Sequence, residues 1–190
     1  GSIAFPESGL GIYPGLGGML RMNRHVGKPL TKYYTYTGTK LTAAAAKELG
    51  IVAELVGMEE IQATIEKMVG RGKIDKYAAR DIPPAYNEII TAFSDENVKR
   101  MLNGEPVKGV SEELAARITK IISYKGIIAL ETMNELIDQQ SSLTIEEGIA
   151  LELAGLTAIF KTEDALSGLL AATSGERPEF KTKVGGRRSS

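Results

Sequence analysis

The N-terminal part of the chain contains a segment that disfavours regular secondary structure, Phe5-Pro6-Glu7-Ser8-Gly9-Leu10-Gly11-Ile12-Tyr13-Pro14-Gly15-Leu16-Gly17-Gly18. Five glycines fall in the ten positions from Gly9 to Gly18, and Pro14 lies among them. Each glycine weakens a helix or a strand because it loses more conformational freedom on folding than any other residue. We therefore interpret the segment as a loop at which the backbone closely approaches another group.

Glu7 lies between this loop and the short apolar run Ile3-Ala4-Phe5, which predicts a β-strand. Pro6 fixes the chain immediately before it. A carboxyl group at the end of a strand can act as a general acid or base, and its pKa rises if the site excludes water. A single glutamate is nevertheless more often a surface residue than a catalytic one. Because a strand this short needs a partner, and a parallel partner would lie upstream, we expect the chain to be the downstream part of something larger.

The glycine loop is open to three functional interpretations. A dinucleotide-binding G-x-G-x-x-G motif fails because Pro14 stands where the third glycine should be. A phosphate-binding loop should end in G-K-[ST], and Gly18-Met19-Leu20 does not. In the third, the glycines from Gly15 onward open a helix whose free N–H groups face a small polar ligand. The alternative to all three is a tight turn without a ligand.

Composition excludes several classes of protein. The 190 residues include 23 basic and 24 acidic residues, a net charge of -1, so a nucleic-acid partner is not expected. Cysteine is absent and His25 is the only histidine, which excludes disulfide frameworks, thiolate zinc sites and HExxH metal sites. We accordingly expect no bound metal. His25 itself is interpreted as a surface or packing residue.

No apolar run approaches the ~20 residues of a membrane-spanning helix, and no secretory signal is visible. The sequence therefore predicts a cytoplasmic protein with no membrane partner. Gly1-Ser2 and the tail of residues 185–190, which carries Arg187-Arg188, are left out of the fold.

Beyond the loop the pattern is mainly helical. Helices are predicted over residues 20–26 and from Pro29, over 43–49 after Thr42, and over 59–69 with an apolar stripe. Residues 51–56 predict a second short strand. Further helices start after Ser94, Ser111, Thr144 and Thr162, and the one after Ser111 is long or broken near Gly126. These elements suggest a core over 1–56, a helical insertion over 57–110, a C-terminal helical region over 111–184 and a tail over 185–190.

The residues after the glycine loop continue one recognisable pattern. Arg21, Val26-Gly27-Lys28, Thr37-Gly38 and residues 46–52 follow it in order. Together with residues 5–18 they resemble the second half of the signature of the crotonase (enoyl-CoA hydratase/isomerase) family. A second group of residues resembles that family's C-terminal helices and tail. It consists of Glu147-Gly148, Phe160, Thr162-Glu163-Asp164, Gly168 and residues 177–181.

The resemblance implies a fold and a context. The chain is expected to be mainly α with two or three short strands, as the C-terminal part of a crotonase-like (ClpP/crotonase) α/β fold. The long middle segment, with Ser94-Asp95-Glu96-Asn97 and Tyr124-Lys125, is similar to archaeal fusions of 3-hydroxyacyl-CoA dehydrogenase with enoyl-CoA hydratase. In those fusions the hydratase is the C-terminal part, so NAD is expected only in the dehydrogenase part that this chain lacks.

The resemblance also implies roles for single residues. The family hydrates trans-2-enoyl-CoA thioesters in β-oxidation without a cofactor, and Glu7 matches the carboxyl group that exchanges a proton with the α-carbon. The Gly15 amide matches the donor to the attacking water. Arg177 and Lys181 are candidate contacts to CoA phosphates. Ala172 and Gly175 stand where an aromatic residue and a lysine often contact adenine, so that contact does not carry over.

The family's other carboxyl group and both oxyanion donors belong to its first half, which no residue here matches. The isolated chain is therefore expected to be inactive, with an acyl-CoA, the upstream half of its own parent chain and further copies of itself as partners. The alternatives are an enoyl-CoA isomerase, in which one carboxyl group moves a proton without water, and a non-catalytic helical module that assembles subunits.

Overall fold

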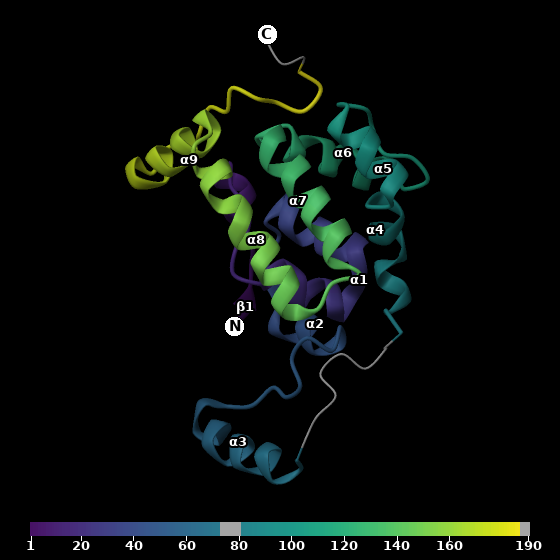
Figure 1. The fold of residues 1–190 in the computed structure, drawn as a ribbon. Helices are drawn as coiled ribbons and strands as arrows, with labels where there is room; N and C mark the ends of the chain where they lie inside the picture. The colour runs from purple at the N-terminus through teal and green to yellow at the C-terminus, as the bar shows by residue number, and fades with distance from the viewer. Residues whose placement is uncertain (73–80, 187–190) are drawn as a thin grey trace.

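The computed structural model describes residues 1–72 and 81–186 of the chain (Figure 1). It is mostly helical, with a small two-stranded sheet, as expected for a crotonase-family domain. The predicted tail at 187–190, with its two arginines, and residues 73–80 of the predicted insertion lie outside the described residues. The elements are β1 (Ser2–Ile3), η1 (Glu7–Leu10), α1 (Gly18–Thr37), β2 (Leu41–Thr42), α2 (Ala43–Glu48), η2 (Met58–Glu60), α3 (Ile61–Gly70), η3 (Pro84–Tyr86), α4 (Asn87–Ala92), α5 (Asp95–Leu102), α6 (Glu112–Ile122), α7 (Ile127–Gln140), α8 (Ile145–Phe160) and α9 (Glu163–Ser174).

The sheet differs from the expectation in its pairing. β1 pairs with β2 in antiparallel register, with Ser2 opposite Thr42 and Ile3 opposite Leu41, so the partner that this chain supplies lies downstream of β1. The strand predicted over residues 51–56 is wrong. The amides of Ile51 and Val52 both donate to the Ala46 carbonyl at the end of α2, which turns the chain back on the helix. These amides are thus used locally and cannot join a sheet.

The core forms around α1, which packs against α4, α6, α7 and α8 (Figure 1). The helix consists of two segments joined at Gly27, whose φ of 77° and ψ of 172° are not helical. This break agrees with the two helices predicted over 20–26 and from Pro29. Tyr33 and Tyr36 are buried on the second segment and meet Phe93 edge to face, with centroid distances of 5.5 and 6.1 Å.

Most predicted helix starts are confirmed because each is fixed by one local hydrogen bond. The side chains of Thr42, Ser94, Ser111, Thr144 and Thr162 each accept from the backbone N–H three residues later. Thr144 and Glu147 form the predicted capping box. The predicted break near Gly126 is also present, since α6 ends at Ile122 and α7 begins after Gly126.

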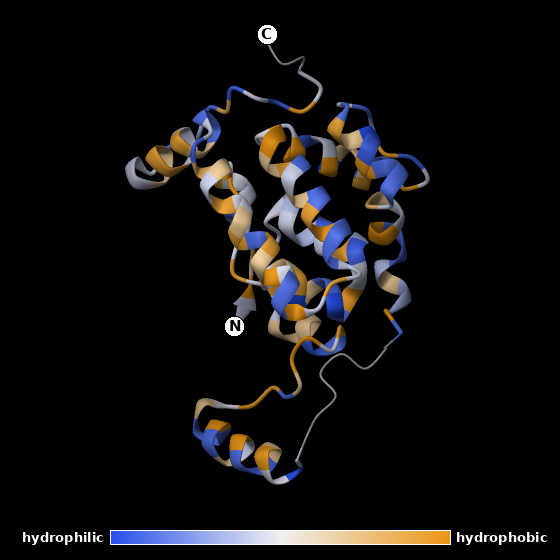
Figure 2. Cartoon of the chain, in the orientation of Figure 1, coloured by the Kyte–Doolittle hydropathy of each residue, from blue (hydrophilic) through white to orange (hydrophobic). Residues whose placement is uncertain are grey.

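The helix predicted over 59–69 forms as η2 and α3, but its apolar stripe remains exposed. No residue of α3 is buried, and the Ile61 and Ile65 side chains are 39% and 50% exposed. Figure 2 shows hydrophobic segments on α3, which stands away from the other helices. An apolar face in this position favours association with another surface.

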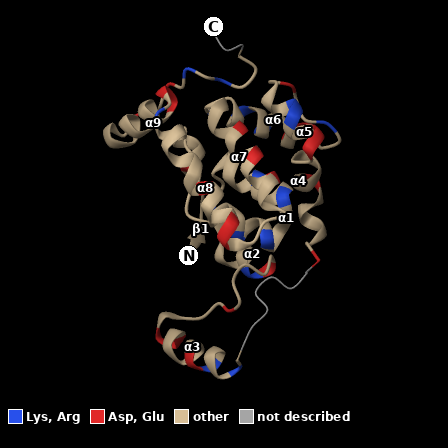
Figure 3. Ribbon diagram, in the orientation of Figure 1, with Lys and Arg blue, Asp and Glu red and all other residues tan. Residues whose placement is uncertain are grey.

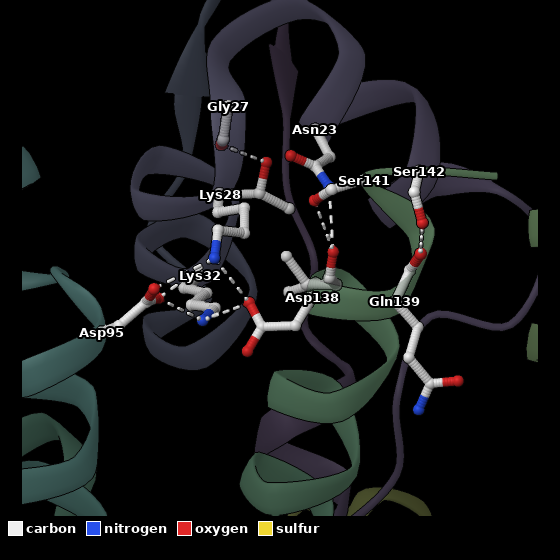
Figure 4. A network of polar contacts seen from close by, with 11 residues as sticks. Asn23, Gly27, Lys28, Lys32, Asp95, Asp138, Gln139, Ser141 and Ser142 are labelled. Atoms are coloured by element: carbon white, nitrogen blue, oxygen red, sulfur yellow. Dashed lines mark hydrogen bonds and ion pairs between the residues drawn. The ribbon is translucent and has the colours of Figure 1, made fainter.

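Charged residues of both signs are interspersed over the helices (Figure 3). One group of them fixes the second half of α1: Lys28 and Lys32 both contact Asp95 at the start of α5 and Asp138 on α7 (Figure 4). The Lys32 side chain is 1% exposed, and its Nζ lies 2.8 Å from Asp138. Among the described helices, none has the length and hydropathy needed to cross a bilayer.

Candidate functional site

Glu7 is the first residue of η1 and follows β1 and Pro6. Its side chain is half-buried, and one carboxylate oxygen, Oε2, is buried with no hydrogen-bond partner among the described residues. Burial raises the pKa of Glu7 above its usual value of 4.5, and the hydrogen bond to its own backbone N–H partly opposes that rise. The carboxyl group is thus partly withdrawn from water, and its Oε2 lacks a partner among the described residues, a setting typical of proton-transfer groups.

The backbone around Glu7 is held rigidly. The Gly9 amide donates to the Pro6 carbonyl at 2.9 Å, and the Ile12 amide donates to the Glu7 carbonyl at 3.2 Å. The buried Ser8 hydroxyl donates to the Tyr36 carbonyl at 2.9 Å, which fastens η1 to the end of α1. These contacts fix the point from which the Glu7 side chain extends.

Helix α9 lies directly on η1, and two glycines allow this contact. A Cβ on Gly168 would lie 2.2 Å from the Leu10 carbonyl oxygen. A Cβ on Gly11 would lie 2.8 Å from the Asp164 backbone, and the Gly11 φ of 69° is itself unfavourable for other residues. The spacing between α9 and η1 therefore leaves no room for a side chain at either position.

The glycine loop is clamped by α8 at three points. The Tyr13 hydroxyl donates to the Glu152 carbonyl at 2.6 Å, and the Gly17 amide donates to the Glu152 carboxylate at 2.5 Å. A Cβ on Gly15 would lie 2.4 Å from Cδ2 of Leu156, so the loop lies against α8 without a gap. Within the described residues the Gly15 amide makes no hydrogen bond. The expectation that the loop amides face a ligand is therefore wrong for Gly17 and stays a prediction for Gly15.

Glu152 is a buried residue that holds the glycine loop and that the sequence analysis missed. It is fully buried, and its second oxygen accepts from Gln140 Nε2 at 2.7 Å. Burial raises the pKa of Glu152, while the hydrogen bonds from Gln140, Gly17 and Leu20 act in the opposite direction. A buried acceptor at the start of α1 also suits the positive end of the helix dipole. After the first turn of α8, Glu152 is the only charged residue of the helix, and this was the available signal.

The two candidate phosphate contacts lie in different surroundings. Lys181 forms an exposed ion pair with Glu163 at 2.6 Å. The Arg177 guanidinium lies over the Tyr124 ring, 4.3 Å from its centroid, and borders a pocket of about 390 Å³ together with Lys120 and Lys125. Arg177 thus belongs to a basic pocket, and Lys181 does not border it.

No group of three or more His, Asp or Glu side chains is arranged to hold a metal ion within residues 1–72 and 81–186. Ala172 and Gly175, which replace the adenine-contacting residues, are both exposed at the end of α9.

Comparison with known proteins agrees with this arrangement. The family model described as Enoyl-CoA hydratase/isomerase matches residues 2–183. The chain is 25% identical over 176 residues to a probable enoyl-CoA hydratase of Rhizobium meliloti, which covers 93% of this chain and 49% of the relative. It is 24% identical over 175 residues to a probable mitochondrial enoyl-CoA hydratase 2 of Arabidopsis thaliana, covering 92% and 42%. It is 41% identical over 66 residues to a crotonyl-CoA hydratase of Syntrophomonas wolfei, covering 35% and 25%. This chain, which spans half the length or less of these relatives, belongs to the enoyl-CoA hydratase/isomerase (crotonase) family.

Proposed function

We propose that this chain carries one of the two catalytic carboxyl groups of an enoyl-CoA hydratase, which adds water to a trans-2-enoyl-CoA thioester. The single observation that carries the proposal is the Glu7 carboxyl group, half-buried beside the glycine loop with one buried oxygen that no described residue satisfies. Such an oxygen is costly unless a water or a ligand contacts it.

In the proposed reaction, water adds across the double bond while the thioester oxygen gathers negative charge. Glu7 holds the water and exchanges a proton with the α-carbon, and burial raises its pKa above the usual value, which favours the protonated form that can donate a proton. The Gly15 amide, which has no other partner among the described residues, donates to the water. Its glycine lets the backbone come close to the substrate.

The remaining parts of the site come from outside the chain. The other carboxyl group and the two donors to the thioester oxygen belong to the first half of a crotonase domain. Without these groups, nothing stabilises the negative charge that develops on the thioester oxygen. Proton transfer by Glu7 is then not catalysed, so the chain alone is inactive. The proposed parent is a fusion with an NAD-dependent 3-hydroxyacyl-CoA dehydrogenase that works in cytoplasmic β-oxidation. In support, the chain is 26% identical over 171 residues to a fatty acid oxidation complex subunit alpha of Psychrobacter cryohalolentis.

Two alternatives remain. Isomerisation of the double bond also needs a carboxyl group that moves a proton. Two relatives, from Bacillus subtilis and Mycosarcoma maydis, carry both hydratase and isomerase in their names. A non-catalytic assembly role is favoured by exposed apolar side chains on α8 and α9, namely Leu153, Phe160, Leu166 and Leu170. These same surfaces support a homo-oligomer under either function.

Complementation tests these functions against one another. The chain is co-expressed with the upstream half of a crotonase domain, and the products from crotonyl-CoA and from a 3-enoyl-CoA are separated by chromatography. A 3-hydroxyacyl-CoA formed only when both parts are present supports hydration. A shifted double bond without added water supports isomerisation. A complex that assembles but forms neither product favours the assembly role.

A further inference from the structure

A basic pocket is bordered by Gly9, which belongs to the same short helix, η1, as Glu7. It has a volume of about 390 Å³ and is bordered by Gly9 of η1, by Lys120 near the end of α6, by Tyr124 and Lys125, and by Arg177 of the C-terminal segment. None of the described residues that border it is acidic. The adjoining smaller pocket shares Lys125 and Arg177 and adds Glu179 and Lys183, so the surroundings remain net positive.

Lys125 is the innermost of these cations. Its Nζ lies 3.7 Å from the place where a Cβ on Gly9 would be, and 4.0 Å from the corresponding place on Gly38. Burial lowers its pKa, yet it forms no hydrogen bond or ion pair within the part of the chain that the structure describes. A partly desolvated ammonium without a partner is unfavourable, so an anion in the pocket would relieve this cost.

Arg177 is held at the rim of the pocket by its contact with Tyr124 and by the anchoring of the segment that follows it. Its guanidinium lies over the Tyr124 ring, which leaves the N–H groups at its edge free to donate. The segment that carries it is anchored by Asp164, a buried residue of α9 whose carboxylate accepts from the amides of Lys181 at 2.7 Å and Thr182 at 3.3 Å. The pocket therefore presents a positioned guanidinium and a half-buried ammonium, the pair of groups that binds a carboxylate or phosphate.

The position of the pocket indicates which anion it takes. Gly9 and Glu7 belong to the same four-residue η1, so the pocket wall begins within about 7 Å of the Glu7 backbone. The phosphates of CoA are separated from the reacting carbons by the whole pantetheine arm. A carboxylate at the far end of a short acyl chain is separated by only a few carbon atoms.

We propose that this basic pocket binds a carboxylate at the distal end of the acyl chain, so that the substrate is an enoyl-CoA with a second acid group. The proposal rests on the proposed function, because it takes Glu7 as the place of reaction. The acyl chain would run from Glu7 past Gly9, where the missing side chain leaves Lys125 accessible.

Binding to the 190-residue chain tests the inference. Dissociation constants are measured by calorimetry for glutaryl-CoA, butyryl-CoA, CoA alone and inorganic phosphate. Glutaryl-CoA should bind about tenfold or more tightly than butyryl-CoA, as expected for one charge-assisted contact. Lys125→Met should remove this preference. Because Lys125 is half-buried, Arg177→Gln at the exposed rim is the second variant and should reduce the preference, and the exposed Lys67→Met of α3 is the control that should leave it unchanged.

Several results would overturn the inference. Equal affinities for glutaryl-CoA and butyryl-CoA would overturn this inference and leave the proposed function standing, because the proposed function is tested separately by hydration. The same holds if Lys125→Met and Arg177→Gln both keep the preference. If CoA alone or inorganic phosphate binds as tightly as glutaryl-CoA and depends equally on Lys125, the pocket recognises phosphate and not an acyl carboxylate. Failure of both thioesters to bind would also reject it.

Discussion

The Glu152 carboxylate on α8 accepts a hydrogen bond from the Gly17 amide at the start of α1, with an oxygen to nitrogen distance of 2.5 Å. The two residues are 135 positions apart, yet this contact fixes the end of the glycine loop. The loop that gives the sequence its family signature is therefore shaped by a helix far downstream. The contact on α8 therefore fixes the position at which the glycine loop passes into α1.

Replacing Glu152 with Gln should destabilise the chain. The glutamine places an NH₂ group opposite either the Gly17 amide or the Gln140 amide, so one buried donor loses its acceptor. We expect a loss of about 1–3 kcal/mol in the free energy of unfolding, measured with urea. The exposed Glu135→Gln on α7 is the matched control and should change it by less than about 0.5 kcal/mol. A Glu152 variant as stable as this control would show that the buried hydrogen bonds contribute nothing.

The contact between Gly15 and Leu156 should be visible as coupling between two substitutions. Gly15→Ala brings a Cβ to within 2.4 Å of Leu156 Cδ2 and should cost about 1–3 kcal/mol, since the leucine must leave its position. In a Leu156→Ala background the same substitution should cost less, because the overlapping atoms are gone. Denaturation of the two single variants and the double variant gives the coupling. Additive costs would place the loop away from α8.

The buried carboxyl group of Glu7 should make stability depend on pH in a predictable direction. Burial raises its pKa, so above the usual value of 4.5 the folded chain holds a proton that the unfolded chain releases. The contribution of Glu7 to the free energy of unfolding therefore falls as the pH rises from 4.5 through the raised pKa. Glu7→Gln lacks this loss, so its stability relative to the wild type should increase over that interval and then level off. Urea titrations at several pH values measure the difference, and a difference that stays constant would mean that the Glu7 carboxyl is solvated.

The ion-pair group on α1 should respond unequally to the loss of its two acids. Asp138→Asn leaves the buried Lys32 with only the longer contact of 3.3 Å to Asp95 and should cost about 2–3 kcal/mol. Asp95 is 69% exposed, so Asp95→Asn should cost less than about 1 kcal/mol. Thermal unfolding in low salt compares the two variants. The reverse order would show that Asp95 and not Asp138 neutralises Lys32.

Local chemistry explains which parts of the fold were predictable. Helix starts such as those at Thr144 and Thr162 depend on one side chain and a backbone group three residues away, so the sequence alone reveals them. The false strand at 51–56 had suitable residues, but the Ala46 carbonyl takes two of its amides. That competition is invisible in a pattern of side chains.

The candidate site likewise contains residues that the local sequence identifies and residues that it does not. Glu7 could be identified because proline, glutamate and the glycines are neighbours in sequence, and the structure places its carboxyl group partly out of water. Glu152 and Lys125 could not, since their environments are formed by residues distant in the chain, such as Gly17 and Gly9. For such residues the sequence identifies the ionisable group, but only the tertiary packing shows which groups it contacts.

The rate at which the complemented protein hydrates crotonyl-CoA, compared between the wild-type chain and Glu7→Gln at equal folded fraction, tests the account most directly. If Glu7 transfers the proton, the variant should be at least about 100-fold slower, in the range expected for loss of a general acid or base. The exposed Glu135→Gln should retain the full rate. Equal rates for the wild-type chain and Glu7→Gln would contradict the assignment of Glu7 as the proton-transfer group.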